Sequence, residues 1–198
     1  MRKLKLETQI SVDGFVADAE GGTDWMVWNW GKEWTWDPAL QKYHTDLTSS
    51  VDCILLSRKM AEEGFINHWK KTAENEQDQQ YEFAKHITDT HKIVFSKTLK
   101  KSEWENTEIA KDDLITEINT LKRKNGKDII AYGGASFVSS LIGAGLIDEY
   151  HLVVNPTAIG NGKPIFRELN SKMDLRLVKA ASYDHGIVVL HYVPAERL

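Results

Sequence analysis

The first hydrophobic pattern along the chain has a period of two residues. Apolar side chains at Leu4, Leu6 and Ile10 alternate with polar ones, and Asp13-Gly14 follows with residues that are typical of turns. Alternation with this period places the apolar side chains on one face of a β-strand. The chain therefore begins with a predicted strand that has one strongly buried face.

Short apolar runs without alternation recur further along the chain. Four of them, at residues 53–56, 92–95, 129–132 and 150–154, predict strands that are buried on both faces, as in a parallel sheet. Near the C-terminus, residues 175–179 and 187–193 resemble the arms of a hairpin, with Asp184-His185-Gly186 near its turn. These strands are separated by segments with a different pattern.

Helical segments lie between the strands. Asp37 and Pro38 are typical of an N-cap and a first helical position, so we expect a helix from Pro38 to about Ser49. Other helices are predicted at residues 58–65, in a segment ending near Thr90, and at residues 112–124 and 135–144, with a polar linker at 70–80. Alternating strands and helices without a repeat or a clear boundary predict one α/β domain over residues 1–198, with a largely parallel sheet and an antiparallel C-terminal hairpin.

Composition narrows the class of protein. Lys and Arg total 25 against 29 Asp and Glu, and this net charge of -4 argues against a nucleic-acid partner. No apolar run approaches the length of about 20 residues that spans a membrane, and the N-terminus lacks the apolar block of a signal peptide. The single cysteine, Cys53, excludes an intramolecular disulfide and sits in an apolar strand, so we expect an inert thiol in a cytoplasmic protein.

Candidate chemistry gathers where the predicted inner strands end. Ser57-Arg58-Lys59, Ser96-Lys97 and Gly133-Gly134-Ala135-Ser136 each follow one of these strands. Ligands of α/β sheets bind at the carboxyl ends of the strands, and glycines, helix N-termini and Arg suit a phosphate group. The alternatives are a glycine pair that only makes a tight turn, surface cations that are only solvated, and Ser136 as a helix cap.

Six segments carry a resemblance to a known family. They are SVDGFVA at residues 11–17, Asp24-Trp25, ILLSRK at 54–59, YGGA at 132–135, EYHLVVNP at 149–156 and IGNGKPIF at 159–166. In this order they resemble the dihydrofolate reductase-like superfamily, and most closely the C-terminal reductase domain of the bacterial riboflavin-biosynthesis deaminase/reductase, here in a stand-alone form. The resemblance implies a three-layer fold with a central sheet of about eight strands, and NADPH bound across the strand ends.

The resemblance also assigns roles to residues. It places Arg58 at the 2′-phosphate of NADPH, Gly133 and Gly134 at the pyrophosphate, and Gln9 and Val16 near the nicotinamide. Together with the strand-end segments, the expected cofactor contacts are Gln9, Val16, Ser57, Arg58, Lys59, Ser96, Lys97, Gly133, Gly134, Ala135 and Ser136. The family usually has Gly at the position of Ser57, where a side chain either crowds the cofactor or adds a hydrogen bond.

A reductase of this type needs a proton donor as well as a hydride. The position that resembles the acid of dihydrofolate reductases is Gln41, a poor donor, which argues against folate reduction. Asp24 is the other catalytic candidate. Trp25 and His44 are expected in the substrate pocket. Trp25 belongs to a tryptophan-rich segment, residues 25–36, and packing, an interface or a lid accounts for its other tryptophans, Trp28, Trp30, Trp34 and Trp36. The histidines show no metal-binding spacing, so no metal is expected.

The sequence therefore predicts an NADPH-dependent reductase of a small heterocyclic or sugar-bearing substrate. It is expected to resemble 5-amino-6-(5-phosphoribosylamino)uracil reductase and to form a homodimer. One alternative is dihydrofolate reductase activity, and another is a nucleotide-binding protein without catalysis.

Overall fold

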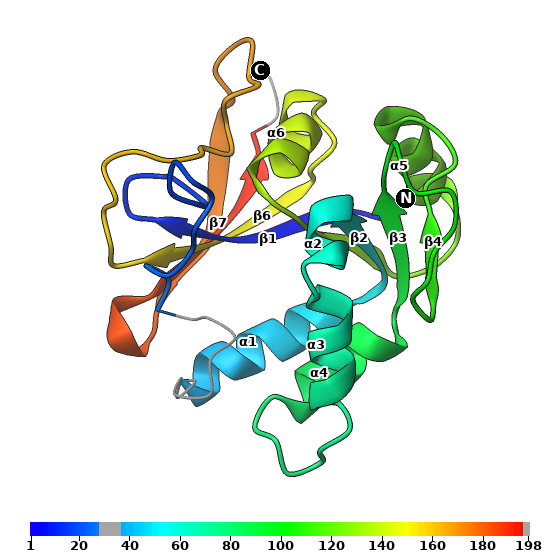
Figure 1. The fold of residues 1–198 in the computed structure, drawn as a ribbon. Helices are drawn as coiled ribbons and strands as arrows, with labels where there is room; N and C mark the ends of the chain where they lie inside the picture. Colours follow the sequence, from blue (N-terminus) through cyan, green and yellow to red (C-terminus); the bar gives the residue numbers. More distant parts are fainter. Residues whose placement is uncertain (28–36, 196–198) are drawn as a thin grey trace. The chain divides into compact units, whose positions relative to one another are not determined.

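The computed structural model describes residues 1–27 and 37–195 (Figure 1). They divide into two compact units. The first comprises Met1–Leu4 and Ala39–Gly133, and the second comprises Lys5–Pro38 and Gly134–Leu198. Trp28, Trp30, Trp34 and Trp36, for which packing, an interface or a lid was expected, lie outside the described residues.

The first unit is built around four parallel strands. In chain order its elements are α1 (Pro38–Ser49), β2 (Val51–Ser57), α2 (Arg58–Glu62), α3 (Phe65–Thr72), α4 (Tyr81–Asp89), β3 (His91–Phe95), β4 (Thr107–Ile109), α5 (Leu114–Arg123) and β5 (Asp128–Tyr132). The strands are ordered β4-β3-β2-β5. The inner strand β2 buries Ile54, Leu55 and Leu56 completely, as its continuous apolar run predicted.

The second unit combines parallel and antiparallel pairing. It contains β1 (Leu4–Ser11), α6 (Ala135–Gly143), β6 (Glu149–Asn155), β7 (Leu175–Ser182), the 3₁₀ turn η1 (Asp184–Gly186) and β8 (Val188–Pro194). The strands are ordered β1-β6-β8-β7. Strand β1 runs parallel to β6, whereas β8 is antiparallel to both β6 and β7. The strands predicted in this unit and the C-terminal hairpin are therefore confirmed.

Three elements differ from the sequence prediction. The short helix expected at residues 58–65 ends at Glu62, and Gly64 then takes a left-handed conformation with φ 102°. A separate helix, α3, continues to Thr72, into the segment predicted as a linker, because Phe65, Ile66 and Trp69 bury one face of it. The short strand β4 was not predicted, since three residues give too little pattern to recognise.

Strand β1 is buried more completely than its alternating pattern suggested. Leu4 and Leu6 are fully buried, but Lys5 and Glu7 on the other face are also only 8% and 5% exposed. The polar face of this strand is therefore covered as well. Within the described residues, no helix is long and apolar enough to cross a membrane.

A buried lysine in the first unit gives a pH-dependent prediction. The Nζ atom of Lys92 donates hydrogen bonds to the carbonyl oxygens of Thr88 and Thr90, at 2.9 and 2.7 Å, and burial lowers its pKa from 10.5 to about 8. Between these values the unfolded chain still holds the proton that the native state has released, so this lysine's contribution to stability rises with pH. We expect the wild-type protein to gain up to about 3 kcal/mol relative to Lys92→Met between pH 7.5 and 10.5.

Urea unfolding of both proteins across this range measures the effect. The buried groups Cys53 and Tyr150 have raised pKa values and an opposite pH dependence, but they are common to both proteins and cancel in the difference. A difference that stays constant with pH would show that Lys92 keeps its ordinary pKa.

Candidate functional site

Three of the predicted segments follow neighbouring strands of the first unit. Ser57 pairs with Phe95 across β2 and β3, and Leu56 pairs with Tyr132 across β2 and β5. Because these strands are parallel and in register, Ser57, Ser96 and Gly133 lie at the same carboxyl edge of the sheet. The prediction of a phosphate site depends on the ends of these strands lying close together. Within this unit, the structure places them together.

The segment after β2 forms the start of α2. The hydroxyl of Ser57 accepts a hydrogen bond from the backbone N–H of Met60 at 3.1 Å, so this side chain caps the helix. Arg58 and Lys59 are exposed and form i,i+4 ion pairs with Glu62 (2.6 Å) and Glu63 (3.3 Å). Exposed pairs of this kind contribute little stability, so both cations are available to an incoming phosphate.

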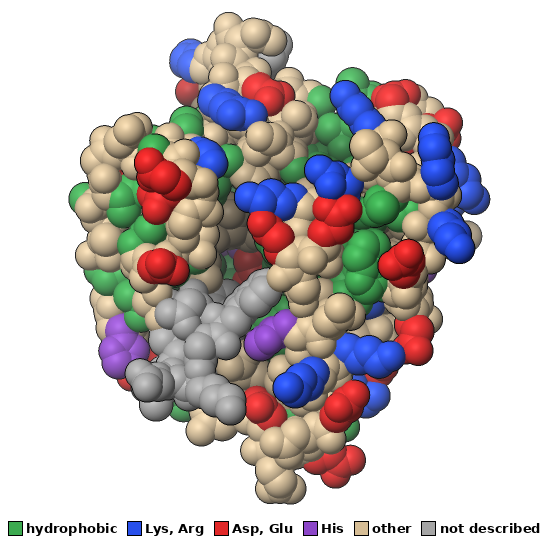
Figure 2. All heavy atoms as spheres, viewed as in Figure 1, with side chains coloured by type: hydrophobic (Ala, Val, Ile, Leu, Met, Phe, Trp, Pro, Cys, Tyr) green, Lys and Arg blue, Asp and Glu red, His purple; other side chains and the backbone are tan. Residues whose placement is uncertain are grey.

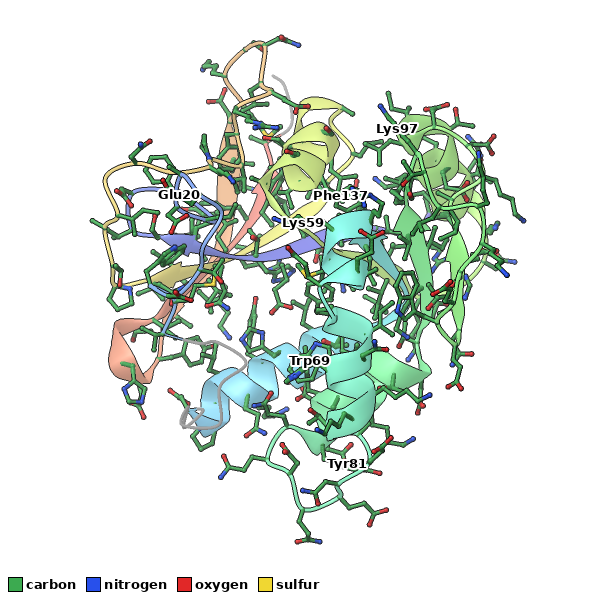
Figure 3. The ribbon with its side chains drawn as sticks, in the orientation of Figure 1. Glu20, Lys59, Trp69, Tyr81, Lys97 and Phe137 are labelled. Carbon is green, nitrogen blue, oxygen red and sulfur yellow. The ribbon has the colours of Figure 1, made fainter. Side chains whose placement is uncertain are left out.

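The segment after β3 borders a cavity of about 640 Å³. The Ser96 hydroxyl accepts hydrogen bonds from the backbone N–H groups of Thr98 and Leu99, at 3.1 and 2.9 Å, and this fixes the turn that begins the cavity wall. Four lysines line the cavity, Lys97, Lys100, Lys101 and Lys111, together with the carboxylate of Glu108. Lys and Arg side chains gather over β3, β4 and α5 (Figure 2), where Lys97 is labelled in Figure 3.

Three of these lysines were missed by the sequence reasoning. Lys100 and Lys101 lie within four residues of Lys97, so the sequence itself shows a cluster of positive charge that could have indicated them. Lys111 joins them only because β4 pairs with β3 and returns the chain to the same place.

In the second unit, Gly134 occupies the N-cap position of α6. Its φ of -74° and ψ of 172° are accessible to any residue, so the turn itself does not require glycine here. A Cβ atom added to Gly134 would meet no atom of the described residues within 4 Å. Gly134 has no side chain that could cap this helix, in contrast to Ser57 and Asp113, which cap α2 and α5. The N-terminus of α6 thus combines open space beside Gly134 with an N-cap residue that offers no side-chain acceptor.

An arginine stands beside this helix start. The Nη2 atom of Arg167 donates a hydrogen bond to the Ser136 hydroxyl at 2.9 Å, and both side chains are exposed. Ala135, by contrast, is buried, so only its backbone can contact a ligand. Sequence reasoning included Ser136 but missed Arg167, because 31 residues separate the two.

The predicted nicotinamide residues lie in the same unit. The Gln9 side-chain oxygen accepts a hydrogen bond from Asn155 Nδ2 at 3.1 Å, and Asn155 Oδ1 accepts one from the backbone N–H of Val27 at 2.8 Å. Asn155 is fully buried and was not predicted, although it stands in the EYHLVVNP segment. Val16 is also buried, and its N–H donates to the Lys163 carbonyl at 3.0 Å.

The catalytic and substrate candidates divide between the units. Asp24 is exposed and Trp25 is half-buried in the second unit, and the Trp25 indole N–H is buried without a hydrogen-bond partner among the described residues. Gln41 and His44 lie on α1 of the first unit, where Gln41 is half-buried and His44 is fully buried, edge-on to Phe83 at 6.3 Å. The roles assigned to these four residues stay predictions.

Asp13 is confirmed as a residue of the turn. Its carboxylate accepts hydrogen bonds from the Ser11 hydroxyl (2.6 Å) and from the backbone N–H groups of Gly160 (2.7 Å) and Ile159 (3.2 Å). These contacts, with Ser11 contributing most, lower the pKa of the carboxyl group below its usual value. The side chain therefore joins the loop after β1 to the 159–160 segment.

The eight strands in the described residues and the strand-end site define an α/β protein with a dihydrofolate reductase-like fold. Comparison with known families identifies one of them. The chain belongs to the RibD C-terminal domain family, whose model matches residues 2–189. The resemblance predicted from the six segments is thus confirmed.

Individual proteins are similar to this chain in sequence or in fold. The uncharacterized protein YyaP of Bacillus subtilis is 32% identical over 193 residues, which are 96% of this chain and 94% of YyaP. A structure named as a riboflavin biosynthesis protein of Shewanella sp. PV-4 has a TM-score of 0.71 at 19% identity, covering 99% of this chain and 100% of that one. The deaminase/5-amino-6-(5-phosphoribosylamino)uracil reductase of Thermotoga maritima has a TM-score of 0.66 at 15% identity, over 98% of this chain and 57% of that one.

Proposed function

We propose that this protein is an NADPH-dependent reductase that acts on a small heterocyclic or sugar-bearing substrate. Membership of the RibD C-terminal domain family supports the reaction class, and the reductase named in the Thermotoga maritima structure supports the type of substrate. The observation that carries the cofactor is the N-terminus of α6, where the open space beside Gly134 and the lack of an N-cap side chain suit a pyrophosphate.

The residues present fit the phosphates of this cofactor. Gly134 and the first N–H groups of α6 bind the pyrophosphate, with the Arg167 guanidinium as a further donor through its exposed fork. Arg58 binds the 2′-phosphate after it releases Glu62, and the lysines of the cavity beside Lys97 add positive charge in the first unit. When bound, the nicotinamide supplies a hydride.

The substrate is oriented by polar groups of the second unit. The buried Trp25 indole N–H offers a hydrogen-bond donor to a carbonyl oxygen of a heterocycle, and its ring offers a flat apolar surface. The Gln9–Asn155–Val27 hydrogen bonds fix the backbone that follows Trp25. Asp24 is the proposed proton donor, because a carboxyl group can take up a proton from water and pass it to the product, whereas the amide of Gln41 has no acidic proton.

The first test compares NADPH and NADH binding to the wild-type protein and to Arg58→Ala. We expect NADPH to bind the wild type about tenfold more tightly than NADH, a difference of about 1.4 kcal/mol, because Arg58 pairs with the extra phosphate. Arg58→Ala is expected to remove this preference without weakening NADH binding. Quenching of the tryptophan fluorescence measures both affinities.

Arg123→Ala provides the matched control. Arg123 is also an exposed arginine of the first unit, but it ends α5 and so precedes β5, away from the carboxyl edge. An NADPH preference that survives Arg58→Ala would remove Arg58 from the site. Failure of the wild type to bind either nucleotide would refute the reductase, and binding without turnover of any candidate substrate, dihydrofolate included, would favour a nucleotide-binding protein.

A further inference from the structure

Three side chains with metal-binding atoms meet on the sheet of the second unit. Glu149 and His151 are two residues apart on β6 and so share a face, and His191 on β8 is the antiparallel partner of His151. The Oε2 atom of Glu149 lies 3.5 Å from His151 Nε2 and 3.6 Å from His191 Nε2. The ligand atoms of all three residues lie within 4.8 Å of one another.

These separations suit a shared metal ion better than direct hydrogen bonds. Nitrogen–oxygen hydrogen bonds are usually about 2.7–3.2 Å long, which is shorter than both distances. Around a tetrahedral zinc ion with bonds of about 2.0–2.1 Å, two ligand atoms are about 3.3–3.4 Å apart, close to the values here. The imidazole rings are stacked, with centroids 4.3 Å apart and an angle of 16° between their planes, so one of them must rotate out of the stack before both nitrogen lone pairs point at one ion.

The surroundings of the cluster favour a cation. Glu149 and His151 are buried, at 9% and 5% exposure, and the side chain of His191 is 21% exposed, although its Nε2 atom is buried. On β1, Lys5 is the register partner of Glu149 and Glu7 is the partner of His151, and both are buried. The carboxylates of Glu149 and Glu7 would attract a divalent ion, whereas the ammonium group of Lys5 would oppose one.

The cluster is distinct from the strand-end residues of its own unit. The pair Lys5–Glu149 precedes the pair Ser11–Asn155 by six residues on each strand, which corresponds to about 20 Å along the sheet. No metal was expected from the sequence because the histidines lack short spacing: His191 is 40 positions beyond His151 and reaches it only through the antiparallel pairing of β6 and β8.

We propose that Glu149, His151 and His191 bind one divalent first-row transition-metal ion, with zinc the preferred species and water as the fourth ligand. Two imidazoles and one carboxylate are a known zinc ligand set, and imidazole disfavours magnesium and calcium. The site holds the neighbouring strands β6 and β8 together. It does not depend on the proposed reductase activity.

The experiment titrates ZnCl2 into untagged protein that has been treated with chelator and dialysed, with isothermal titration calorimetry as the readout. We expect one zinc ion per chain, and an affinity at least tenfold lower in His191→Gln and in Glu149→Gln. Substitution with Co2+ should give the absorption of a tetrahedral ion in the wild type only. Zinc should also raise the melting temperature of the wild type and not that of His191→Gln.

His91→Gln is the matched control. His91 and Glu108 form an exposed pair in the first unit with a nitrogen–oxygen distance of 3.2 Å, so they offer two ligands without a third. Equal affinity in the wild type and in a folded His191→Gln or Glu149→Gln protein would overturn the proposal. Loss of binding in His91→Gln, or the absence of saturable binding in the wild type, would also overturn it, and circular dichroism establishes which variants are folded.

Discussion

Gly134→Asp should lower the affinity for NADPH at least about 100-fold, a loss of about 2.7 kcal/mol, without destabilising the protein. The backbone at Gly134 has the extended conformation of a normal N-cap, and an added Cβ meets no described atom within 4 Å. An aspartate here would supply the N-cap side chain that Gly134 lacks and interact favourably with the helix dipole. The same carboxylate would occupy the phosphate position and repel the cofactor's negative charge, so binding and stability should change independently.

Gly134→Asn is the control for shape. Asparagine caps a helix about as well as aspartate but carries no charge, so its NADPH affinity should fall between those of wild type and Gly134→Asp. Thermal unfolding and fluorescence titration on the three proteins give both quantities. Unchanged NADPH affinity in Gly134→Asp would mean that no phosphate approaches α6, and that the glycine pair only connects β5 to the helix.

Trp69→Ala should cost about 3–5 kcal/mol in the free energy of unfolding. Trp69 is 1% exposed on α3 (Figure 3) and meets three aromatic rings edge-on: His68 at 4.6 Å, Phe83 at 4.8 Å and Phe65 at 6.2 Å. Truncation removes these contacts and leaves a cavity between α3 and α4, which neighbouring side chains fill only in part. Urea unfolding followed by far-ultraviolet circular dichroism measures the loss.

Trp69→Phe should cost less than half as much. It keeps one aromatic ring in place and removes the Trp69 indole N–H, which is buried without a hydrogen-bond partner in the described part of the chain. Trp104, which is only half-buried, serves as a control, and its substitution by Ala should have a smaller effect than Trp69→Ala. A cost below about 1 kcal/mol for Trp69→Ala would show that α3 contributes little to the core of its unit.

Local patterns were sufficient for most of the fold. The alternation at Leu4 and Leu6, the unbroken run around Leu55 and the Asp37-Pro38 helix start each depend on neighbours in the sequence, and β1, β2 and α1 appear where these signals placed them. The same patterns failed at α3, because two lysines near its end resembled a linker while its burial depends on Phe83, a residue of the next helix.

The residues of the candidate site that stand next to a strand were predictable from the sequence, and those placed by distant contacts were not. Ser57, Ser96 and Gly133 were identified because each directly follows a recognisable strand, and parallel strands in register end at one edge. Arg167, Asn155 and Lys111 were not identified, since each owes its position to a contact with a distant segment.

The sequence by itself thus determined most of the order of strands and helices, the family, and the strand-end segments for which phosphate binding is proposed. Only the tertiary structure decided which side chains from distant parts of the sequence lie close together. Examples are Ser136 with Arg167, and Glu149 with His151 and His191. The physical reason is that local patterns encode backbone conformation and burial over a few residues, whereas these contacts depend on strand register and loop paths that involve the whole chain.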